Sequence, residues 1–128
     1  MTSSLSDWVY TPIIQTEWGR WWQDLNDVHI EVNLSPGTKS KDIKIDLTIK
    51  NISIEVLGKT IISGALFKPV KRSELIWYIR EGGSILYVNL TKLNNFSEDD
   101  QWDNLLQNCE CKADGLDYFV DIVKNVLN

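Results

Sequence analysis

Hydrophobic and polar residues alternate along most of the chain between residues 28 and 91. Val28, Ile30 and Val32 are separated by polar residues, which is the period of a strand with one buried face. Turn residues separate successive runs, and no helical period interrupts them. The pattern predicts an antiparallel β-sandwich of seven to eight strands, in preference to a parallel sheet. The further predicted strands are residues 43–49, 52–56, 60–67, 75–79 and 86–90.

The turns between these runs carry residues typical of hairpins. Only Lys50-Asn51 separates two of the strands, which predicts a tight hairpin and places Ile49 on the buried face of its strand. Leu57-Gly58-Lys59 is predicted to form the next turn. Gly82-Gly83 tolerates the positive φ of a hairpin turn between residues 79 and 86.

Helical periodicity occurs only near the end of the sequence, over residues 115–127. We interpret the acidic stretch 94–100 as a linker that returns the following apolar residues to the sandwich. The predicted helix has an apolar stripe that must be covered, and we expect it to pack on its own sandwich, which favours a monomer over a homodimer. The stripe consists of Leu116, Phe119, Val120, Val123 and Leu127.

The first thirty residues contain four of the six tryptophans. They form either a lid that closes one end of the sandwich or an exposed anchor for a partner. Because aromatic side chains of this size bury about 150–250 Å² each, we favour the lid. These tryptophans are Trp8, Trp18, Trp21 and Trp22.

The net charge of −5 is unevenly distributed, and residues 39–72 form a basic segment inside an acidic chain. An acidic chain without an arginine-rich stretch argues against nucleic-acid binding, which depends on phosphate neutralisation. No apolar run reaches the length of a membrane helix, and residues 1–10 lack a basic leader and an apolar core. We therefore expect a cytoplasmic protein that binds neither nucleic acid nor membrane.

No constellation of catalytic residues is recognisable in the sequence. Phosphate-binding glycine loops, nucleophile elbows and His-Glu-x-x-His pairs are missing. The single histidine, His29, is expected to be a solvated surface residue. Cys109 and Cys111 are too close in sequence for an unstrained disulfide and are expected to be free thiols. These observations predict a non-enzymatic protein without metal or cofactor.

A segment at residues 18–38, WGRWWQDLNDVHIEVNLSPGT, resembles the opening of the CS domain in the NudC (nuclear movement) family. That family has a Trp-x-Gln-x-Leu-x-x-Val core followed by a strand and a Pro-containing turn. Residues 62–67 and 75–92 are similar to later strands of the family, and Trp102-x-x-Leu-Leu is similar to its closing segment. The residues that match the opening core are Trp21, Gln23, Leu25 and Val28.

The resemblance covers residues 18–106 and is strongest to the short NudC-domain-containing type. It implies a β-sandwich like that of the small co-chaperones of heat-shock protein 90, and a role in protein folding and dynein-linked nuclear movement. The implied partners are a chaperone of the heat-shock protein 90 class, client proteins or a dynein-associated complex. We accordingly expect an N-terminal extension at 1–17, a CS domain at 18–106 and an amphipathic helical segment at 107–128.

The leading hypothesis is a co-chaperone or adaptor that docks its partner through one sheet face and its edge. Each basic candidate also has a simpler interpretation as a solvated surface residue. Alternatives are a small heat-shock-type holdase and, less favoured, a ligand-binding or enzymatic domain. The candidate partner-binding residues are Lys39, Lys41, Lys44, Lys68, Lys71, Arg72, Lys92 and Trp102.

Overall fold

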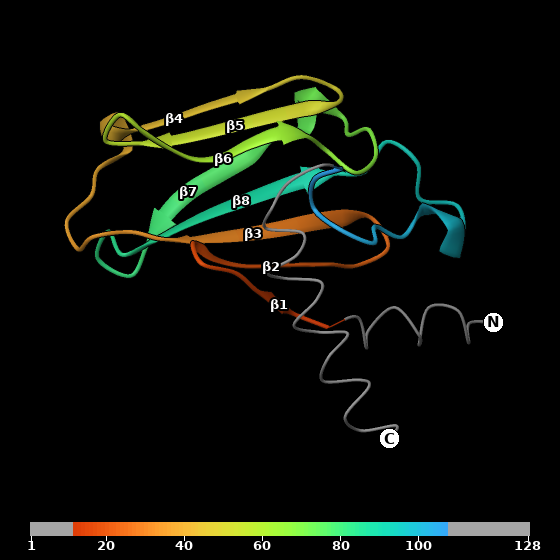
Figure 1. Ribbon diagram of the computed structural model, residues 1–128, viewed down its shortest axis with the longest axis horizontal. Helices are drawn as coiled ribbons and strands as arrows, with labels where there is room; N and C mark the ends of the chain where they lie inside the picture. Colours follow the sequence, from red (N-terminus) through yellow and green to blue (C-terminus); the bar gives the residue numbers. More distant parts are fainter. Residues whose placement is uncertain (1–11, 108–128) are drawn as a thin grey trace.

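A computed structural model describes residues 12–107 of the chain (Figure 1). The predicted helix at 115–127, the two cysteines and Trp8 lie outside the described residues. The described strands are β1 (Ile14–Gln15), β2 (Gly19–Gln23), β3 (Asp27–Asn33), β4 (Ile43–Leu47), β5 (Asn51–Val56), β6 (Lys59–Ala65), β7 (Ile76–Arg80) and β8 (Ile85–Thr91). The short 3-10 helices are η1 (Ser40–Asp42), η2 (Arg72–Glu74) and η3 (Glu98–Asp100).

These strands form two antiparallel sheets that lie face to face (Figure 1). The larger sheet has the order β1-β2-β3-β8-β7, and the smaller has the order β4-β5-β6. Every strand pair in both sheets is antiparallel. The predicted antiparallel β-sandwich is confirmed.

The core lies between the sheets and is built from the inward positions of each strand. Val28, Ile30 and Val32 of β3 are at most 1% exposed, as are the alternate residues of the neighbouring β8. Ile54 of β5 faces them from the smaller sheet and is fully buried. Because alternate strand residues point to opposite faces, the hydrophobic period of the sequence specifies which face is buried.

Two strands precede those that the alternation predicts. The segment GRWWQ forms β2, which pairs with β3 and directs Trp21 inward, where it is 4% exposed. Trp22 points to the opposite face of the same strand, and Trp18 is half-buried. Of the N-terminal tryptophans that the structure describes, Trp21 and Trp22 are therefore strand residues on opposite faces and Trp18 lies between β1 and β2, so they do not form the single lid that we expected.

The segment after residue 100 closes one side of the sandwich. Trp102, Leu105 and Leu106 are at most 2% exposed. The backbone N–H of Phe67 donates a hydrogen bond to the carbonyl of Leu105, with an N···O distance of 3.0 Å that is ordinary for such a bond. The stretch 94–100 thus connects β8 to residues that return to the sandwich, as predicted.

The β4–β5 hairpin is tight, but β4 is shorter than the sequence predicts, whereas β5 begins one residue earlier than predicted, at Asn51. The hydroxyl of Thr48 accepts hydrogen bonds from the N–H groups of Lys50 and Asn51, at 3.3 and 2.9 Å. This arrangement ends β4 at Leu47. Ile49 therefore lies in the turn and is 53% exposed, so its predicted position on the buried face is wrong.

The β5–β6 turn consists of Leu57 and Gly58, one residue less than predicted, because Lys59 is already the first residue of β6. Val56 pairs with Lys59, and the two residues between them have φ values of 53° and 81°. Positive φ at both central positions matches the right-handed twist of the flanking strands. Glycine adopts this region freely, whereas a leucine is strained there because of its Cβ atom.

Replacing Leu57 by asparagine should stabilise the protein. Asparagine tolerates positive φ, and Leu57 is 65% exposed, so little burial is lost. We expect Leu57→Asn to raise the free energy of unfolding by about 0.5–1 kcal/mol. Urea unfolding followed by tryptophan fluorescence measures this change. Leu57→Ala, which has no side-chain amide to stabilise the left-handed conformation, is the control, and equal stability of both variants would contradict the explanation.

Candidate functional site

The outer face of the larger sheet carries a row of four rings, one from each of β2, β3, β8 and β7. Trp22 stacks on His29 with ring centroids 5.2 Å apart, and His29 stacks on Tyr87 at 6.0 Å. Tyr78 is tilted against Tyr87 at 5.1 Å. We call these four residues the aromatic ladder. The strand registers place Trp22 opposite His29 and Tyr78 opposite Tyr87, which brings the rings together.

His29 is an integral part of this ladder. Its side chain is only 14% exposed, its Nδ1 atom is hydrogen-bonded to the Tyr87 hydroxyl at 2.6 Å, and its Nε2 atom lies 2.9 Å from Asp24 Oδ2. The expectation of a solvated surface residue is therefore wrong. The alternation correctly placed His29 on the outward face, but it did not reveal the aromatic neighbours contributed by other strands.

A buried carboxylate lies on the same outer face, next to the aromatic ladder. Glu31 is 5% exposed and forms ion pairs with Arg20 and Arg80, from the strands on either side of the β3–β8 pair. The Arg20 guanidinium lies 5.6 Å from the Trp22 ring centroid, and the Arg80 guanidinium lies 5.0 Å from that of Tyr87. Both cations thus bridge Glu31 and the aromatic ladder, which holds the rings in place.

The β7 end of the face is accessible to a partner. Ile76 is 57% exposed and Tyr78 is 47% exposed, and both point outward from the edge strand. Aromatic residues and arginine are the residue types enriched in protein interfaces. The face therefore combines a pre-ordered aromatic surface with cations of limited mobility, a composition suited to binding another protein.

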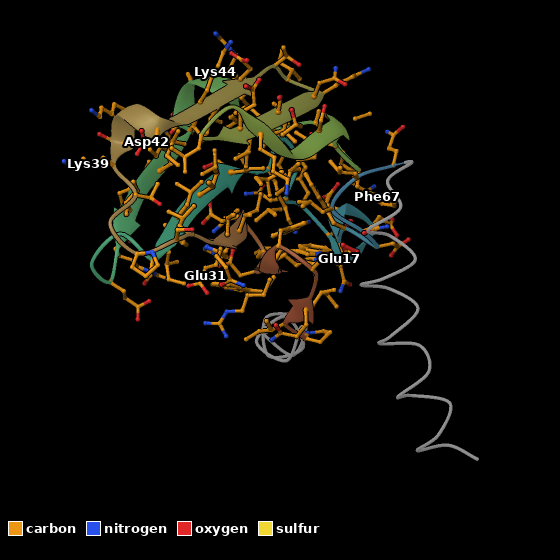
Figure 2. All side chains as sticks on the ribbon, turned by 60° about the vertical axis from the view of Figure 1, so that its left-hand side comes forward. Glu17, Glu31, Lys39, Asp42, Lys44 and Phe67 are labelled. Carbon is orange, nitrogen blue, oxygen red and sulfur yellow. The ribbon has the colours of Figure 1, made fainter. Side chains whose placement is uncertain are left out.

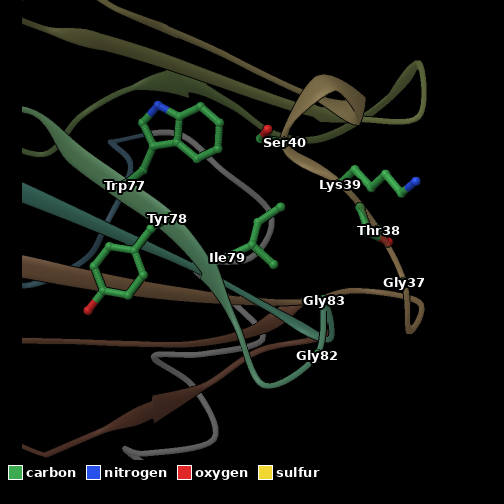
Figure 3. A pocket seen from close by; sticks show the side chains of 9 residues that line it. All are labelled: Gly37, Thr38, Lys39, Ser40, Trp77, Tyr78, Ile79, Gly82 and Gly83. Carbon is green, nitrogen blue, oxygen red and sulfur yellow. The ribbon is translucent and has the colours of Figure 1, made fainter.

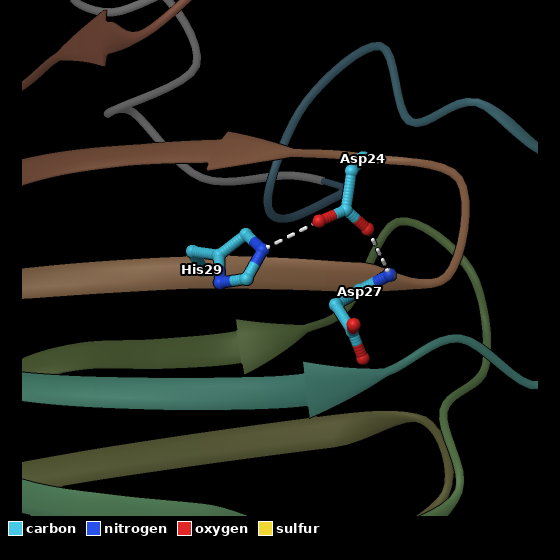
Figure 4. Close-up of side chains that lie close together, drawn as sticks. All are labelled: Asp24, Asp27 and His29. Carbon is cyan, nitrogen blue, oxygen red and sulfur yellow. Dashed lines mark hydrogen bonds and ion pairs between the residues drawn. The ribbon is translucent and has the colours of Figure 1, made fainter. Parts of the chain in front are cut away.

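Asp24, Asp27 and His29 lie together at the β2–β3 turn (Figure 4), with potential metal-ligating atoms within 4.8 Å of one another. The Asp24 carboxylate accepts hydrogen bonds from the N–H groups of Asn26 and Asp27, at 3.1 and 2.8 Å. Asp27 Oδ1 accepts a hydrogen bond from the Thr91 hydroxyl. Because these oxygens already serve local donors, we interpret the cluster as the element that orders the turn.

The electrostatics of Asp24 agree with this structural role. Partial burial alone would raise the pKa of its carboxyl group, but hydrogen bonds from His29 and from the Asp27 N–H outweigh burial. The net effect lowers the pKa of Asp24 below its usual value. The charged carboxylate is therefore the form that the turn stabilises.

A buried lysine joins the larger sheet to the closing segment. Lys92 is 0% exposed, and its Nζ donates a hydrogen bond to Gln23 Oε1 at 2.9 Å. The same Gln23 oxygen accepts from the Trp102 N–H at 2.8 Å, while Gln23 Nε2 donates to the Trp102 carbonyl at 2.7 Å. We call Gln23, Lys92 and Trp102 the polar clasp. It accounts for three residues that the sequence motifs single out.

Burial lowers the pKa of the Lys92 ammonium from 10.5 to about 8, although nearby carboxylates, foremost that of Asp24, partly offset this effect. Between these two pKa values the unfolded chain holds a proton that the folded protein has released. The free energy of unfolding therefore rises with pH over this interval. Below it, the folded state retains the full cost of the buried charge.

Replacing Lys92 by methionine should remove this pH dependence. We expect the group to add up to about 3 kcal/mol to the free energy of unfolding between pH 8 and pH 10.5 in the wild type. Urea unfolding of wild type, Lys92→Met and the exposed control Lys59→Met across this range measures the difference. A constant offset between wild type and Lys92→Met at every pH would contradict the assignment.

The basic candidates of the sequence are divided by the structure into surface and interior positions. Figure 2 shows Lys39 and Lys44 on the side of the smaller sheet, with Glu31 on the opposite, outer face of the larger sheet. Lys92 and Trp102 belong to the polar clasp and are buried, so we do not assign their side chains to a partner-binding surface. Lys68 is half-buried. The exposed candidates are Lys39, Lys41, Lys44, Lys71 and Arg72.

The aromatic ladder is the feature that sequence reasoning missed. In the sequence, each of its four residues occupies an outward position that alternates with the buried residues of its strand. Only the strand order brings these positions together, because β2 and β7 lie at opposite sides of the β3–β8 pair.

Among residues 12–107, no helix is long and apolar enough to cross a membrane.

This two-sheet arrangement, with a closing tryptophan segment, is that of a CS domain. The profile of the CS-domain family matches residues 17–92, and the chain belongs to this family. Within it, the chain is similar to the NudC proteins, as the sequence motifs predict.

Sequence comparison gives the extent of this similarity. Human NudC domain-containing protein 2 is 34% identical over 92 residues, which are 72% of this chain and 57% of the human protein. The nuclear movement protein nudC of Dictyostelium discoideum is 44% identical over 78 residues, which are 57% of this chain and 43% of that protein. The chain thus spans about half the length of these relatives.

Solved structures of NudC-type proteins also superpose on this chain. A nuclear movement protein from E. cuniculi superposes with a TM-score of 0.58 and is 34% identical; the match covers 68% of this chain and 95% of that one. NudC domain-containing protein 2 from Mus musculus superposes with a TM-score of 0.54 and is 33% identical, with coverage of 56% and 55%.

Proposed function

We propose that this protein is a non-catalytic, NudC-type co-chaperone or adaptor that binds other proteins through the outer face of its larger sheet. The observation that carries the proposal is the aromatic ladder, which four strands hold in place and which Glu31 and its two arginines reinforce. A rigid aromatic surface loses little conformational freedom on binding. The family membership supports the same class of function, because CS domains of this type are generally non-catalytic.

The proposed partners are a chaperone of the heat-shock protein 90 class or unfolded client proteins, in the cytoplasm. The names of the relatives support a link to nuclear movement, and we extend this link to a dynein-associated complex as part of the proposal. The exposed basic residues on β4 and in the segments around η1 and η2 remain predicted contacts for such partners. They lie away from the aromatic ladder, so a partner that uses both surfaces would have to reach around the β7 edge.

Chemistry at the site also supports binding over catalysis. The ring nitrogens of His29 are occupied by Tyr87 and Asp24, and no serine or cysteine is among its partners within the described residues. The holdase alternative relies on an exposed Ile-x-Ile anchor. The two Ile-x-Ile sequences of the described chain lie inside β4 and β5, where Ile52 and Ile54 are buried.

Removing the exposed part of the face should weaken client binding. We expect wild-type protein to suppress heat aggregation of citrate synthase equally with and without ATP. The double variant Ile76→Ser/Tyr78→Ser should require about tenfold more protein for the same suppression, because it removes the accessible apolar area. Light scattering measures the effect.

Phe96→Ser provides the matched control, since Phe96 is 85% exposed but lies outside both sheets. Circular dichroism verifies that each variant is folded. Equal loss of suppression in the double variant and in Phe96→Ser would contradict the assignment to the outer face. A strict requirement for ATP would contradict a passive, non-catalytic role.

A further inference from the structure

The two lateral sides of the sandwich are built differently. On one side, the segment 102–106 fills the gap between the sheets, held by Gln23 of β2 and by Phe67, just after β6. On the other side, β4 ends the smaller sheet and β7 ends the larger one. No described strand pairs with the outer edge of either strand, and at the β4 edge the Arg72 side chain donates a hydrogen bond to the Leu47 carbonyl at 2.7 Å. We call the space between these two edges the edge groove.

The edge groove contains two hollows. One, of about 590 Å³, lies between β7, the Gly82-Gly83 turn and the loop at residues 37–40 (Figure 3). The other, of about 430 Å³, lies between β4, Arg72 and Leu75. In Figure 3, Trp77 and Ile79 point toward the loop, whereas Tyr78 points to the opposite face. Tyr78 also lines the larger hollow, although its ring belongs to the aromatic ladder, so the groove and the ladder share β7 and lie on its two sides.

Apolar side chains at the edge groove are incompletely buried. Ile45 of β4 and Trp77 and Ile79 of β7 occupy inward positions but are only half-buried. Their cross-strand partners Ile54 and Val88, in the neighbouring strands, are fully buried. The inward side chains are thus less buried on this side of the sandwich than at its centre. An additional strand at this side could cover their exposed parts.

β7 lacks the features that usually protect an edge strand. Its sequence is Ile-Trp-Tyr-Ile-Arg, without proline, without lysine and with a regular register to β8. Natural proteins commonly blunt an exposed edge with charges, prolines or bulges, because its unpaired backbone groups bind any extended segment. An unprotected apolar edge beside a groove is the structural basis of binding by strand addition.

The rim of the groove is basic. Lys39 lines the larger hollow and Arg72 lines the smaller one, and Lys44 is exposed on β4 between them. Nearby acidic groups are partly engaged: Asp42 accepts a hydrogen bond from the Lys39 N–H, and Asp46 lies 4.0 Å from Lys44. Among the described ion pairs, none involves Lys39 or Arg72, although the Arg72 guanidinium is held by the Leu47 carbonyl and Asp46 lines the smaller hollow beside it. The rim therefore favours an acidic ligand.

We propose that the edge groove binds an extended, acidic segment of another protein whose alternate residues are apolar, and that this segment adds to the larger sheet along β7. Its apolar side chains enter the groove beside Leu75, Trp77 and Ile79, which recur at every second residue. Its acidic residues face the basic rim. Residues two apart in a strand are about 6.8 Å apart, so ligand and groove have the same spacing. This site lies on the other side of β7 from the aromatic ladder.

The probe for this proposal is the synthetic peptide Gly-Asp-Ile-Asp-Ile-Asp-Gly, titrated into the full-length ¹⁵N-labelled protein. We expect saturable amide shifts concentrated at residues 75–79 and 43–47. A version with N-methyl groups on the first isoleucine and on the aspartate that follows it should bind at least about tenfold more weakly. Successive N–H groups of a strand point to opposite edges, so one of the two methyl groups faces β7 in either register. A version with Lys in place of each Asp should also lose affinity. Equal binding of the N-methylated peptide, or shifts confined to the outer face, would overturn the proposal.

Two variants test the groove itself. Ile79→Ser should weaken binding of the peptide about tenfold, and Lys39→Glu about threefold. The matched charge control is Lys59→Glu, at the far edge strand β6, which should leave affinity unchanged. If Ile79→Ser fails to fold, the Lys39 and Lys59 pair and the N-methylated peptide decide the question. Equal effects of the two charge reversals would overturn the proposal.

Sedimentation equilibrium of the wild type tests a different occupant of the same groove. A monomer that binds the peptide supports the proposal. A dimer that dissociates in Ile79→Ser would assign the groove to a second copy of this chain and would overturn it. Because citrate synthase protection depends on Ile76 and Tyr78 of the outer face, its loss or persistence reports on the proposed function separately from these measurements.

Discussion

The pairing of β3 with β8 is the constraint on which the other strands of the larger sheet depend. It aligns Asp27–Asn33 with Ile85–Thr91, residue by residue, and buries the alternate apolar residues of both strands. A shift of this register by one residue would turn the buried face of either strand toward solvent. The same register places Glu31 opposite Tyr87 and His29 opposite Asn89. The core and the aromatic ladder therefore both depend on this strand pair.

Two buried charges share this framework and have different consequences. Glu31 is neutralised by arginines from β2 and β7, so the strands that flank the central β3–β8 pair are joined electrostatically through β3. Lys92 has its ammonium in the interior, where it joins Gln23 and hence the closing segment. Buried charges of this kind contribute little net stability, but removing one partner leaves the other unsatisfied. They favour one specific arrangement of the strands over alternatives.

Alternation of apolar residues correctly predicted the sandwich, six of the strands and the hairpin turn at Leu57. Local competition explains the main errors. At Ile49 the Thr48 hydroxyl caps the turn, and this hydrogen bonding overrides the apolar pattern. In GRWWQ, tryptophans occupy both faces, so no alternation was visible although the segment is a strand.

The candidate site was less predictable than the fold, because its residues come from strands that are distant in sequence. The charge of Lys92 was recognised as a candidate contact, but its burial depends on Gln23, which lies 69 residues earlier. Trp102 was also a candidate, and its side chain proved to close the core. Both residues follow the family motif because they form the polar clasp, so a motif match here reflects packing and not binding.

The two sides of the sandwich give the domain its asymmetry. The polar clasp and the segment 102–106 complete the core on the β2–β6 side, so the fold does not depend on a ligand at the β4–β7 side. Trp77 and Ile79 can remain half-buried because Val88, Leu86 and the rest of the central core are already fully covered. A strand added at β7 would extend a sheet whose outer face is already ordered. The polar clasp and the proposed edge groove thus lie on opposite sides of one sandwich, and the proposed groove uses apolar residues that the core leaves partly exposed.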